Sequence, residues 1–206
     1  MLLIRHGETP WNAAGRWQGH ADPGLTERGL AQARAVAEAL RAEASGAWQR
    51  IVASDLARAQ QTAEQIALAL GLAIDTDRRL RELDVGRWSG LTREQIRERD
   101  PETLRIFESG DLRVRPGGGE SRQALRDRAL DFARELAAQR AGESVIVVTH
   151  RGVVRALAPG ANPGNAERLL AVVEDVIARR PDARIDSESG AAADAARSRE
   201  PDDAAL

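Results

Sequence analysis

Two apolar runs, each followed at once by a histidine, constrain the fold of this chain more than any other feature. The first is the segment LLI at residues 2–4, which leads through Arg5 to His6. The second is VIVVT at residues 145–149, directly before His150. Runs of this kind are typical of buried parallel strands, and sites in open α/β sheets gather beyond the carboxyl ends of such strands. The sequence therefore predicts two neighbouring strands that bring both histidines to one rim.

The rest of the chain alternates between strand-like and helix-like patterns. Short apolar runs predict strands at residues 50–53 and 72–76, and apolar positions at helical spacing predict helices that begin after Thr26 and after Ser54 or Asp55. Such alternation is typical of an α/β fold with a largely parallel sheet. We therefore expect a three-layer α/β/α sandwich, in which helices cover both faces of a mostly parallel central sheet.

Two capping signals interrupt this alternation in the middle of the chain. Thr92 and Gln95 have the spacing of a capping box, and Asp100 followed by Pro101 is a typical helix start. These signals predict two short helices that form a lid or a side excursion over the sheet. A Gly-rich turn, PGGGES at residues 116–121, then leads into a further helix.

Composition excludes several classes of function. The 206-residue chain contains no Cys, which excludes disulfides, thiolate catalysis and thiolate metal sites. Its net charge of −2 gives no reason to expect binding to nucleic acid or to a membrane surface. Neither a basic leader nor a long apolar stretch precedes the first strand, so we expect no signal peptide, no membrane span and a cytoplasmic protein. Every basic side chain is Arg, so a single Arg carries little functional weight by itself.

The chain changes character towards its end. We expect a catalytic domain at residues 1–160, followed by a helix within residues 161–180. The apolar positions that suggest this helix are Leu169, Leu170, Val173 and Ile177. Residues 181–206 contain too few large apolar side chains to offset the entropy of ordering, so we expect a disordered tail.

Further motifs accompany the two histidines. Asn12 lies in the loop after the first histidine, and SDLARAQQTA at residues 54–63 places Arg58 in the first turn of a helix. Side chains there lean back towards the helix N-terminus, where free N–H groups favour anions. Glu82 lies in a Gly-punctuated loop, and Arg151 follows the second histidine. Two imidazoles, guanidinium groups and a carboxylate at one rim suit chemistry on an anionic group, with phosphate the leading candidate.

In this order, the motifs resemble those of the histidine phosphatase superfamily, the phosphoglycerate-mutase-like proteins, between Leu2 and about Leu157. The resemblance implies that His6 is the nucleophile and forms a phosphohistidine. Glu82 would then protonate the leaving alcohol and later activate the water that hydrolyses the phosphoenzyme. The phosphoryl oxygens would be held by Arg5, Arg58 and His150. The expected substrate-binding positions are Gly7, Thr9, Asn12 and Arg151.

Physical chemistry agrees with these implied roles. Phosphoryl transfer depends on positioning and on preorganised positive charge, which a cradle of Arg and His supplies. His6 must attack as a neutral imidazole, and nearby Arg charges favour that form because they lower its pKa. Nothing in the scheme requires a metal or another cofactor, and the expected partner is a small phosphorylated metabolite.

Several positions keep a second interpretation. Asp84 is an alternative acid, and Glu82 could instead pair with a neighbouring Arg. His20 lies in a polar loop and is expected to be solvated, with substrate contact as the alternative. Glu120 and Ser121 either shape the site or serve only the turn and the helix cap.

The chain departs from the family pattern in two places. Arg151 stands where the family usually has a second glycine, and it either fills part of the pocket or contacts phosphate. Pro159 and Gly160 end the preceding helix early and no β-rich segment follows, so the sheet is expected to lack the final strands of the family. A frameshift in GC-rich coding DNA is one hypothesis for this end of the chain, and the coding DNA would test it.

The leading functional interpretation is a metal-independent phosphomonoesterase. A phosphoglycerate mutase, which retains the phosphoryl group, is the alternative enzyme, but the short stretch between Leu91 and Gly119 favours the phosphatases. A catalytically impaired relative that serves as a binding module is the third interpretation. The altered end of the chain motivates it, and the complete set of site residues argues against it.

Overall fold

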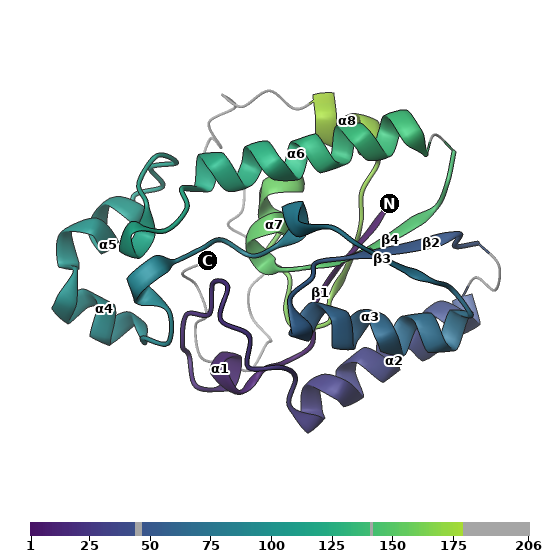
Figure 1. Ribbon diagram of the computed structural model, residues 1–206, viewed down its shortest axis with the longest axis horizontal. Coiled ribbons are helices and arrows are strands. Elements are labelled where there is room, and N and C mark those ends of the chain that lie inside the picture. The colour runs from purple at the N-terminus through teal and green to yellow at the C-terminus, as the bar shows by residue number, and fades with distance from the viewer. Residues whose placement is uncertain (44–46, 141, 179–206) are drawn as a thin grey trace, which may run out of the picture.

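A five-stranded sheet forms the centre of the computed structural model, which describes residues 1–43, 47–140 and 142–178. The strand order is β3-β2-β4-β1-β5, and β5 alone of these strands is antiparallel (Figure 1). The strands are β1 (Leu2–Arg5), β2 (Arg50–Ala53), β3 (Ile74–Thr76), β4 (Val145–Thr149) and β5 (Arg168–Leu170). This mostly parallel sheet confirms the predicted fold class.

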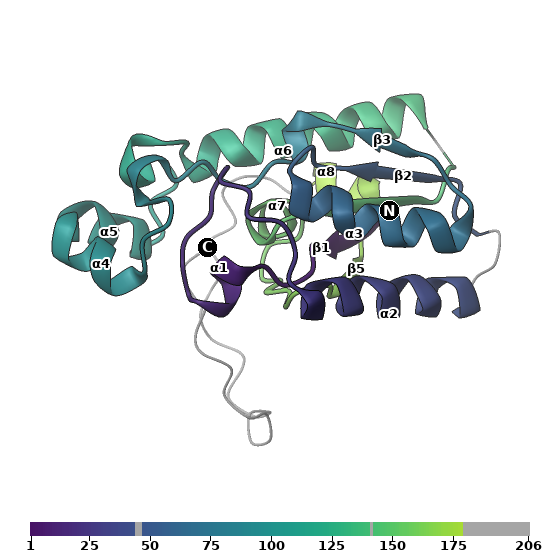
Figure 2. The same ribbon diagram turned by 60° about the horizontal axis from the view of Figure 1, so that its bottom comes forward.

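Helices cover both faces of the sheet, as Figure 2 shows. The helices are α1 (Pro10–Ala13), α2 (Glu27–Glu43), α3 (Ala57–Leu70), α4 (Arg93–Arg99), α5 (Pro101–Glu108), α6 (Arg122–Gln139), α7 (Arg151–Leu157) and α8 (Val173–Ala178). Leu2 and Ile4 of β1 pack with α2 and α3, whereas Leu3 packs with α6, α7 and α8. The pleat of the strand produces this alternation and hence the three layers. None of the described helices is long and apolar enough to cross a membrane.

The register of β1 and β4 fixes the position of the site. Ile4 lies opposite Val148 and Arg5 lies opposite Thr149 in a parallel pair. The next residue of each segment, His6 and His150, therefore leaves the sheet at the same rim. The backbone N–H of His6 still donates to the Thr149 carbonyl at 2.9 Å, so the pairing extends to the functional residue itself.

Local capping signals account for several helix ends. Thr92 and Gln95 form the predicted capping box, with each side chain bound to the backbone of the other residue. Ser121 caps α6 by accepting a hydrogen bond from the Ala124 N–H at 3.2 Å. Gly71 ends α3 with a left-handed φ of 69°, which glycine adopts without strain.

The start of α3 differs from the prediction. Neither Ser54 nor Asp55 caps the helix, because the N-cap is Leu56 and it has no side-chain hydrogen bond. The Asp22 carboxylate, from a loop far away in sequence, accepts from the backbone N–H groups of Ala57 and Arg58 instead. A distant residue thus satisfies these N–H groups, which a local sequence pattern does not reveal.

Helices α4 and α5 form an excursion beyond the ends of the strands, at the left of Figure 1. Three aromatic rings attach this excursion to the body of the protein: Trp17 contacts Trp88 and Phe107 with centroids 5.2 and 5.5 Å apart. Asp100 is the N-cap residue of α5, with Pro101 at the first helical position, and its carboxylate accepts a hydrogen bond from the Trp88 indole at 2.9 Å. The two short helices are confirmed.

The segment after α7 contains a strand and a short helix where the sequence predicts a single helix. Residues 168–170 form β5, which pairs antiparallel with β1 so that Leu2 lies opposite Leu170. Ala171 donates to the Met1 carbonyl at 3.0 Å, and such bonds satisfy the otherwise unpaired outer edge of β1. The apolar positions thus serve a strand and then α8, and the expectation that no strand follows α7 is wrong. Residues 181–206, predicted to be disordered, lie outside the described residues.

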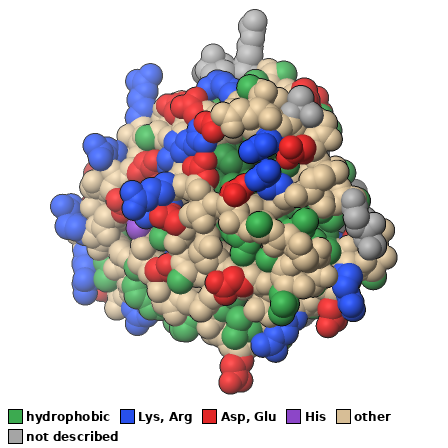
Figure 3. Space-filling model, turned by 45° about the vertical axis from the view of Figure 1, so that its right-hand side comes forward, with side chains coloured by type: hydrophobic (Ala, Val, Ile, Leu, Met, Phe, Trp, Pro, Cys, Tyr) green, Lys and Arg blue, Asp and Glu red, His purple; other side chains and the backbone are tan. Residues whose placement is uncertain are grey.

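Charged side chains of both signs are intermixed over the face that Figure 3 shows. Ion pairs at the surface of the protein include Arg168 with Glu43 and Arg79 with Glu135, both at 2.8 Å. A nearly neutral, intermixed surface fits the net charge of −2.

Candidate active site

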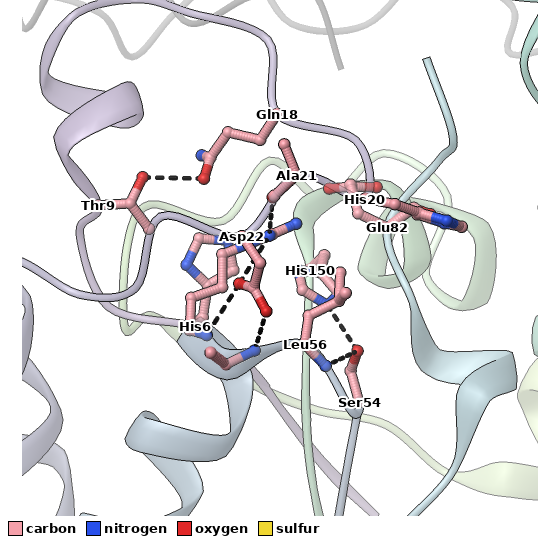
Figure 4. A network of polar contacts seen from close by, with 12 residues as sticks. His6, Thr9, Gln18, His20, Ala21, Asp22, Ser54, Leu56, Glu82 and His150 are labelled. Atoms are coloured by element: carbon pink, nitrogen blue, oxygen red, sulfur yellow. Dashed lines mark hydrogen bonds and ion pairs between the residues drawn. The ribbon is translucent and has the colours of Figure 1, made fainter. Parts of the chain in front are cut away.

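The two histidine rings lie side by side beyond the ends of β1 and β4. Their centroids are 5.1 Å apart, and both rings are buried (Figure 4). The structure therefore brings together the two residues that the strand pattern singled out, and it does so through the parallel register of their strands.

His6 presents one free ring nitrogen. Its Nδ1 lies 2.7 Å from the Gly7 carbonyl oxygen, and because a carbonyl only accepts, Nδ1 carries the proton. Nε2 of the neutral ring then keeps its lone pair. Burial, followed by the charges of Arg58 and Arg5, holds the pKa of His6 well below its usual value, so the ring is neutral at neutral pH.

His150 has one ring nitrogen engaged and one without a protein partner. Nε2 shares a hydrogen bond of 2.9 Å with the Ser54 hydroxyl, whereas Nδ1 is buried and has no partner among the described residues. Burial and then the Arg58 charge lower the pKa of His150 well below its usual value. A buried polar atom without a partner is costly, and a phosphoryl oxygen would supply the missing partner.

Arg58 projects from the first turn of α3 into the same region and is fully buried. Its Nη2 donates to the Gly19 carbonyl and its Nη1 to the Ala21 carbonyl, both at 2.8 Å. Asp22 lies 3.3 Å from Nη1 and balances part of the charge. The Nε atom has no partner among the described residues, so this guanidinium retains a donor for an anion.

Two more guanidinium groups complete a positive cradle. Arg5 is buried and donates through Nη1 to the Pro163 carbonyl at 3.0 Å. Arg151 begins α7 and is also buried. Both groups lower the pKa of His6, which places their charges near its ring. Arg151 directly follows His150 in the chain.

Glu82 is buried, and its carboxylate is held by backbone N–H groups. Oε1 accepts from Leu83 at 2.7 Å and Oε2 accepts from Gly152 at 3.2 Å. A Cβ atom at position 152 would lie 2.2 Å from Oε1, so a larger residue there would displace the Glu82 carboxylate. The alternative acid, Asp84, instead accepts from the Gly86 N–H at 2.9 Å and caps a turn. Both carboxylates thus accept backbone N–H groups, and that of Glu82 also joins its loop to the start of α7.

The loop after β1 uses its polar groups to fix its own shape. The Gly7 N–H donates to the Thr62 hydroxyl at 3.0 Å, and the Thr9 hydroxyl contacts Asn12 and Gln18. Gly7 and Thr9 therefore position the loop in this structure. The Asn12 oxygen accepts several hydrogen bonds within the protein, so a contact to substrate would use its amide nitrogen.

Sequence analysis did not single out three residues that contact this loop or the histidines. Gln18 is buried against Thr9, and Ser54 was considered only as a helix cap although it binds His150. Asn165 donates to the Asn12 oxygen at 3.0 Å from the turn before β5. None of these contacts joins neighbours in sequence, so no local pattern announces them.

His20 is half-buried and not solvated as expected. Its Nε2 donates to the Glu82 carbonyl at 2.9 Å, which ties the loop of Gly19 and Ala21 to the loop of Glu82. Among the residues that the structure describes, no group of three or more His, Asp or Glu side chains is arranged to hold a metal ion.

The sequence matches the family model of the histidine phosphatase superfamily (branch 1) over residues 1–172, and the chain belongs to this family. It is a phosphatase of the histidine phosphatase type, as both the family and its named relatives indicate. The resemblance inferred from the motifs is thereby confirmed.

Two curated relatives and one solved structure show how similar the chain is to known proteins of this family. The chain is 41% identical over 174 residues to a phosphoglycerate mutase-like protein 4 of Arabidopsis thaliana, covering 82% of this chain and 75% of the relative. It is 44% identical over 161 residues to a metal-independent phosphoserine phosphatase of the same plant, and the match covers 76% of this chain and 66% of that relative. A mycobacterial glucosyl-3-phosphoglycerate phosphatase, solved with VO3, superposes with a TM-score of 0.74 at 34% identity, covering 82% of this chain and 90% of that one.

Proposed function

We propose that this protein is a metal-independent phosphomonoesterase that hydrolyses a small phosphorylated metabolite through a phosphohistidine on His6. The hydrogen bond from His6 Nδ1 to the Gly7 carbonyl carries the proposal. It leaves the Nε2 lone pair as the nucleophile of a neutral ring, beside buried guanidinium groups that attract a phosphate.

In the first step, the lone pair of His6 Nε2 attacks phosphorus and the bond between phosphorus and the ester oxygen breaks. The departing oxygen takes a proton from the Glu82 carboxyl and leaves as an alcohol. The free donors of Arg58 and His150 face the charge on the three phosphoryl oxygens. The Gly7 carbonyl stabilises the positive charge that the phosphorylated ring acquires at Nδ1–H.

In the second step, the Glu82 carboxylate removes a proton from a water molecule. The water oxygen attacks phosphorus, and the bond between phosphorus and Nε2 of His6 breaks. Orthophosphate leaves, His6 returns to its neutral form, and Glu82 again carries a proton for the next cycle. The protons and the charge balance without any other reactant.

The alcohol part of the substrate would lie in a cavity of about 460 Å³ next to the loop of Glu82. The polar side chains that line it are His20, Asp84, Arg115, Glu120 and Ser121. Groups of both signs suit an ester that also carries a carboxylate or an amino group. Phosphoserine and glucosyl-3-phosphoglycerate, named for two relatives, have a carboxylate, so both belong in the first substrate panel.

The test combines chelation with trapping of the intermediate. Hydrolysis of p-nitrophenyl phosphate should survive EDTA, and rapid quench with labelled substrate should give an acid-labile, alkali-stable adduct that His6→Ala abolishes. Activity that vanishes on chelation and returns with a divalent ion would contradict the metal-independent reaction. A label that persists in His6→Ala would contradict the assigned nucleophile.

Phosphoryl transfer of the phosphoglycerate mutase type is the second candidate, because one relative carries that name at 41% identity. Both reactions would begin with the same attack by His6. Labelled 3-phosphoglycerate distinguishes them, since a phosphatase releases labelled orthophosphate and a mutase returns the label in 2-phosphoglycerate.

A further inference from the structure

The segment that carries Glu82 is held at four consecutive carbonyl groups. Arg128 binds the carbonyls of residues 79, 81 and 82, with distances of 2.6, 2.6 and 2.9 Å. The Thr149 hydroxyl donates to the carbonyl of Leu80 at 2.8 Å. His20 donates to the carbonyl of Glu82 as well, at 2.9 Å. Side chains from α6, β4 and the loop after β1 therefore fix this short segment.

Arg128 supplies most of these contacts and is itself fixed by an ion pair. Its Nε and Nη2 donate to the two carboxylate oxygens of Glu120, each at 2.7 Å. Both side chains are largely buried, and the planar fork of a guanidinium suits such bidentate geometry. The Glu120 N–H also donates to the Asp84 carbonyl at 2.8 Å. Arg128 and Glu120 therefore bind the backbone both before and after Glu82 in the sequence.

The position of the Glu82 carboxylate depends on these contacts to the backbone. This carboxylate accepts hydrogen bonds from the backbone N–H groups of Leu83 and Gly152, so the position of the backbone determines where the carboxyl group points. Misplacement of a reacting group by about 1 Å costs on the order of 10²-fold in rate. A residue that sets this backbone therefore controls proton transfer without touching the substrate.

We propose that Arg128, oriented by Glu120, is the positioning residue for the catalytic acid of this enzyme. The inference rests on the proposed role of Glu82 as the acid. Arg128 orients the Glu82 backbone relative to the phosphoryl group on His6, and Glu120 is required because it keeps the guanidinium in the plane that meets three carbonyls at once.

The experiment measures the rate of phosphoenzyme formation by rapid quench, with a good leaving group (p-nitrophenyl phosphate) and a poor one (an alkyl phosphate). We expect Arg128→Gln to slow the alkyl ester by on the order of 10²-fold and the nitrophenyl ester far less, because nitrophenolate hardly needs a proton. Arg128→Lys should recover only part of the rate. Arg134→Gln, which breaks an exposed pair on the same helix, is the matched control and should change neither rate.

A double-mutant comparison separates positioning of the acid from general loosening of the fold. In the Glu82→Gln background, Arg128→Gln should cause little further loss, because the group that it positions is already gone. Equal losses with both esters, or the same loss in the Glu82→Gln background, would overturn the proposal. If Arg128→Gln fails to fold, Glu120→Gln takes its place and must show the same dependence on leaving group.

The outcomes also distinguish this inference from the proposed function. If Glu82→Gln slows both esters equally, Glu82 is not the acid and the proposed mechanism fails. If Glu82→Gln selectively slows the alkyl ester while Arg128→Gln and Glu120→Gln do not, the mechanism stands and the positioning role of Arg128 is refuted.

Discussion

The paired strands β1 and β4 and the edge strand β5 lie in one sheet, yet they differ in burial and in function. Every residue of β1 and β4 is buried, and the two histidines of the site directly follow these strands. The three residues of β5 are half-buried or exposed, and Leu170 is 72% exposed. The strands that are buried on both faces position the histidines of the site, whereas the edge strand completes the sheet.

The segment that contains β5 also contacts the site, through the turn that precedes this strand. The Pro163 carbonyl accepts from Arg5 at 3.0 Å, and the Asn165 amide donates to Asn12 at 3.0 Å. The first contact holds a guanidinium of the phosphate cradle, and the second supports the loop that follows His6. Because β5 is exposed and the rim is buried, we expect substitutions at the rim to affect catalysis strongly. Substitutions in β5 should affect stability slightly and catalysis little.

The largest expected effect follows from Arg58→Ala at the rim. Loss of one preorganised cation from the phosphate cradle should lower kcat by on the order of 10²-fold or more. The variant should also be less stable, because the buried carbonyls of Gly19 and Ala21 lose their donors. Steady-state kinetics and urea unfolding measure the two effects. Arg34→Ala, an exposed position on α2, is the control, and comparable turnover in both variants would contradict a role in phosphate binding.

The next effect compares two leucines of the sheet directly. Leu3→Ala removes a fully buried side chain from β1 and should lower the free energy of unfolding by about 2–5 kcal/mol. Leu170→Ala removes a mostly exposed side chain from β5 and should cost less than about 0.5 kcal/mol, with unchanged turnover. Urea denaturation of both variants tests this contrast. Equal losses would show that the edge strand is as important for stability as the centre.

The same contrast explains what the sequence predicts and what it does not. Burial on both faces gives β1 and β4 their continuous apolar runs, so the strands and the rim with His6 and His150 are predictable. β5 has three residues, and the positive φ of 58° in the turn before it falls on Ala166 and not on the neighbouring Gly164 or Asn165. Its partner, β1, lies at the other end of the chain, and local periodicity contains no information about such pairing.

Site residues divide in the same way. Motif order points to Arg58 and Glu82, because their own segments have a recognisable composition. Ser54 and Arg128 act through contacts to residues 96 and 46 positions away, so their roles appear only once the chain is folded. The Asp22 carboxylate at the start of α3 is a further example, since it replaces a local cap from 35 residues away.

The smallest effect concerns pH and belongs to the rim alone. The pKa of His150 lies well below its usual value in the folded protein because of burial and the Arg58 charge, and it returns to about 6.5 on unfolding. Below that pH the unfolded state binds more protons, so stability present above about pH 6.5 is lost as the pH falls towards the folded pKa. Between about pH 7.5 and about pH 5.5, one such histidine can lower the free energy of unfolding by at most about 1.4 kcal/mol.

Urea denaturation at both pH values should therefore show a smaller loss of stability for His150→Asn than for the wild type. Leu170→Ala should keep the wild-type dependence, because no histidine lies in β5. An unchanged dependence in His150→Asn would mean that this ring is not held neutral by the rim.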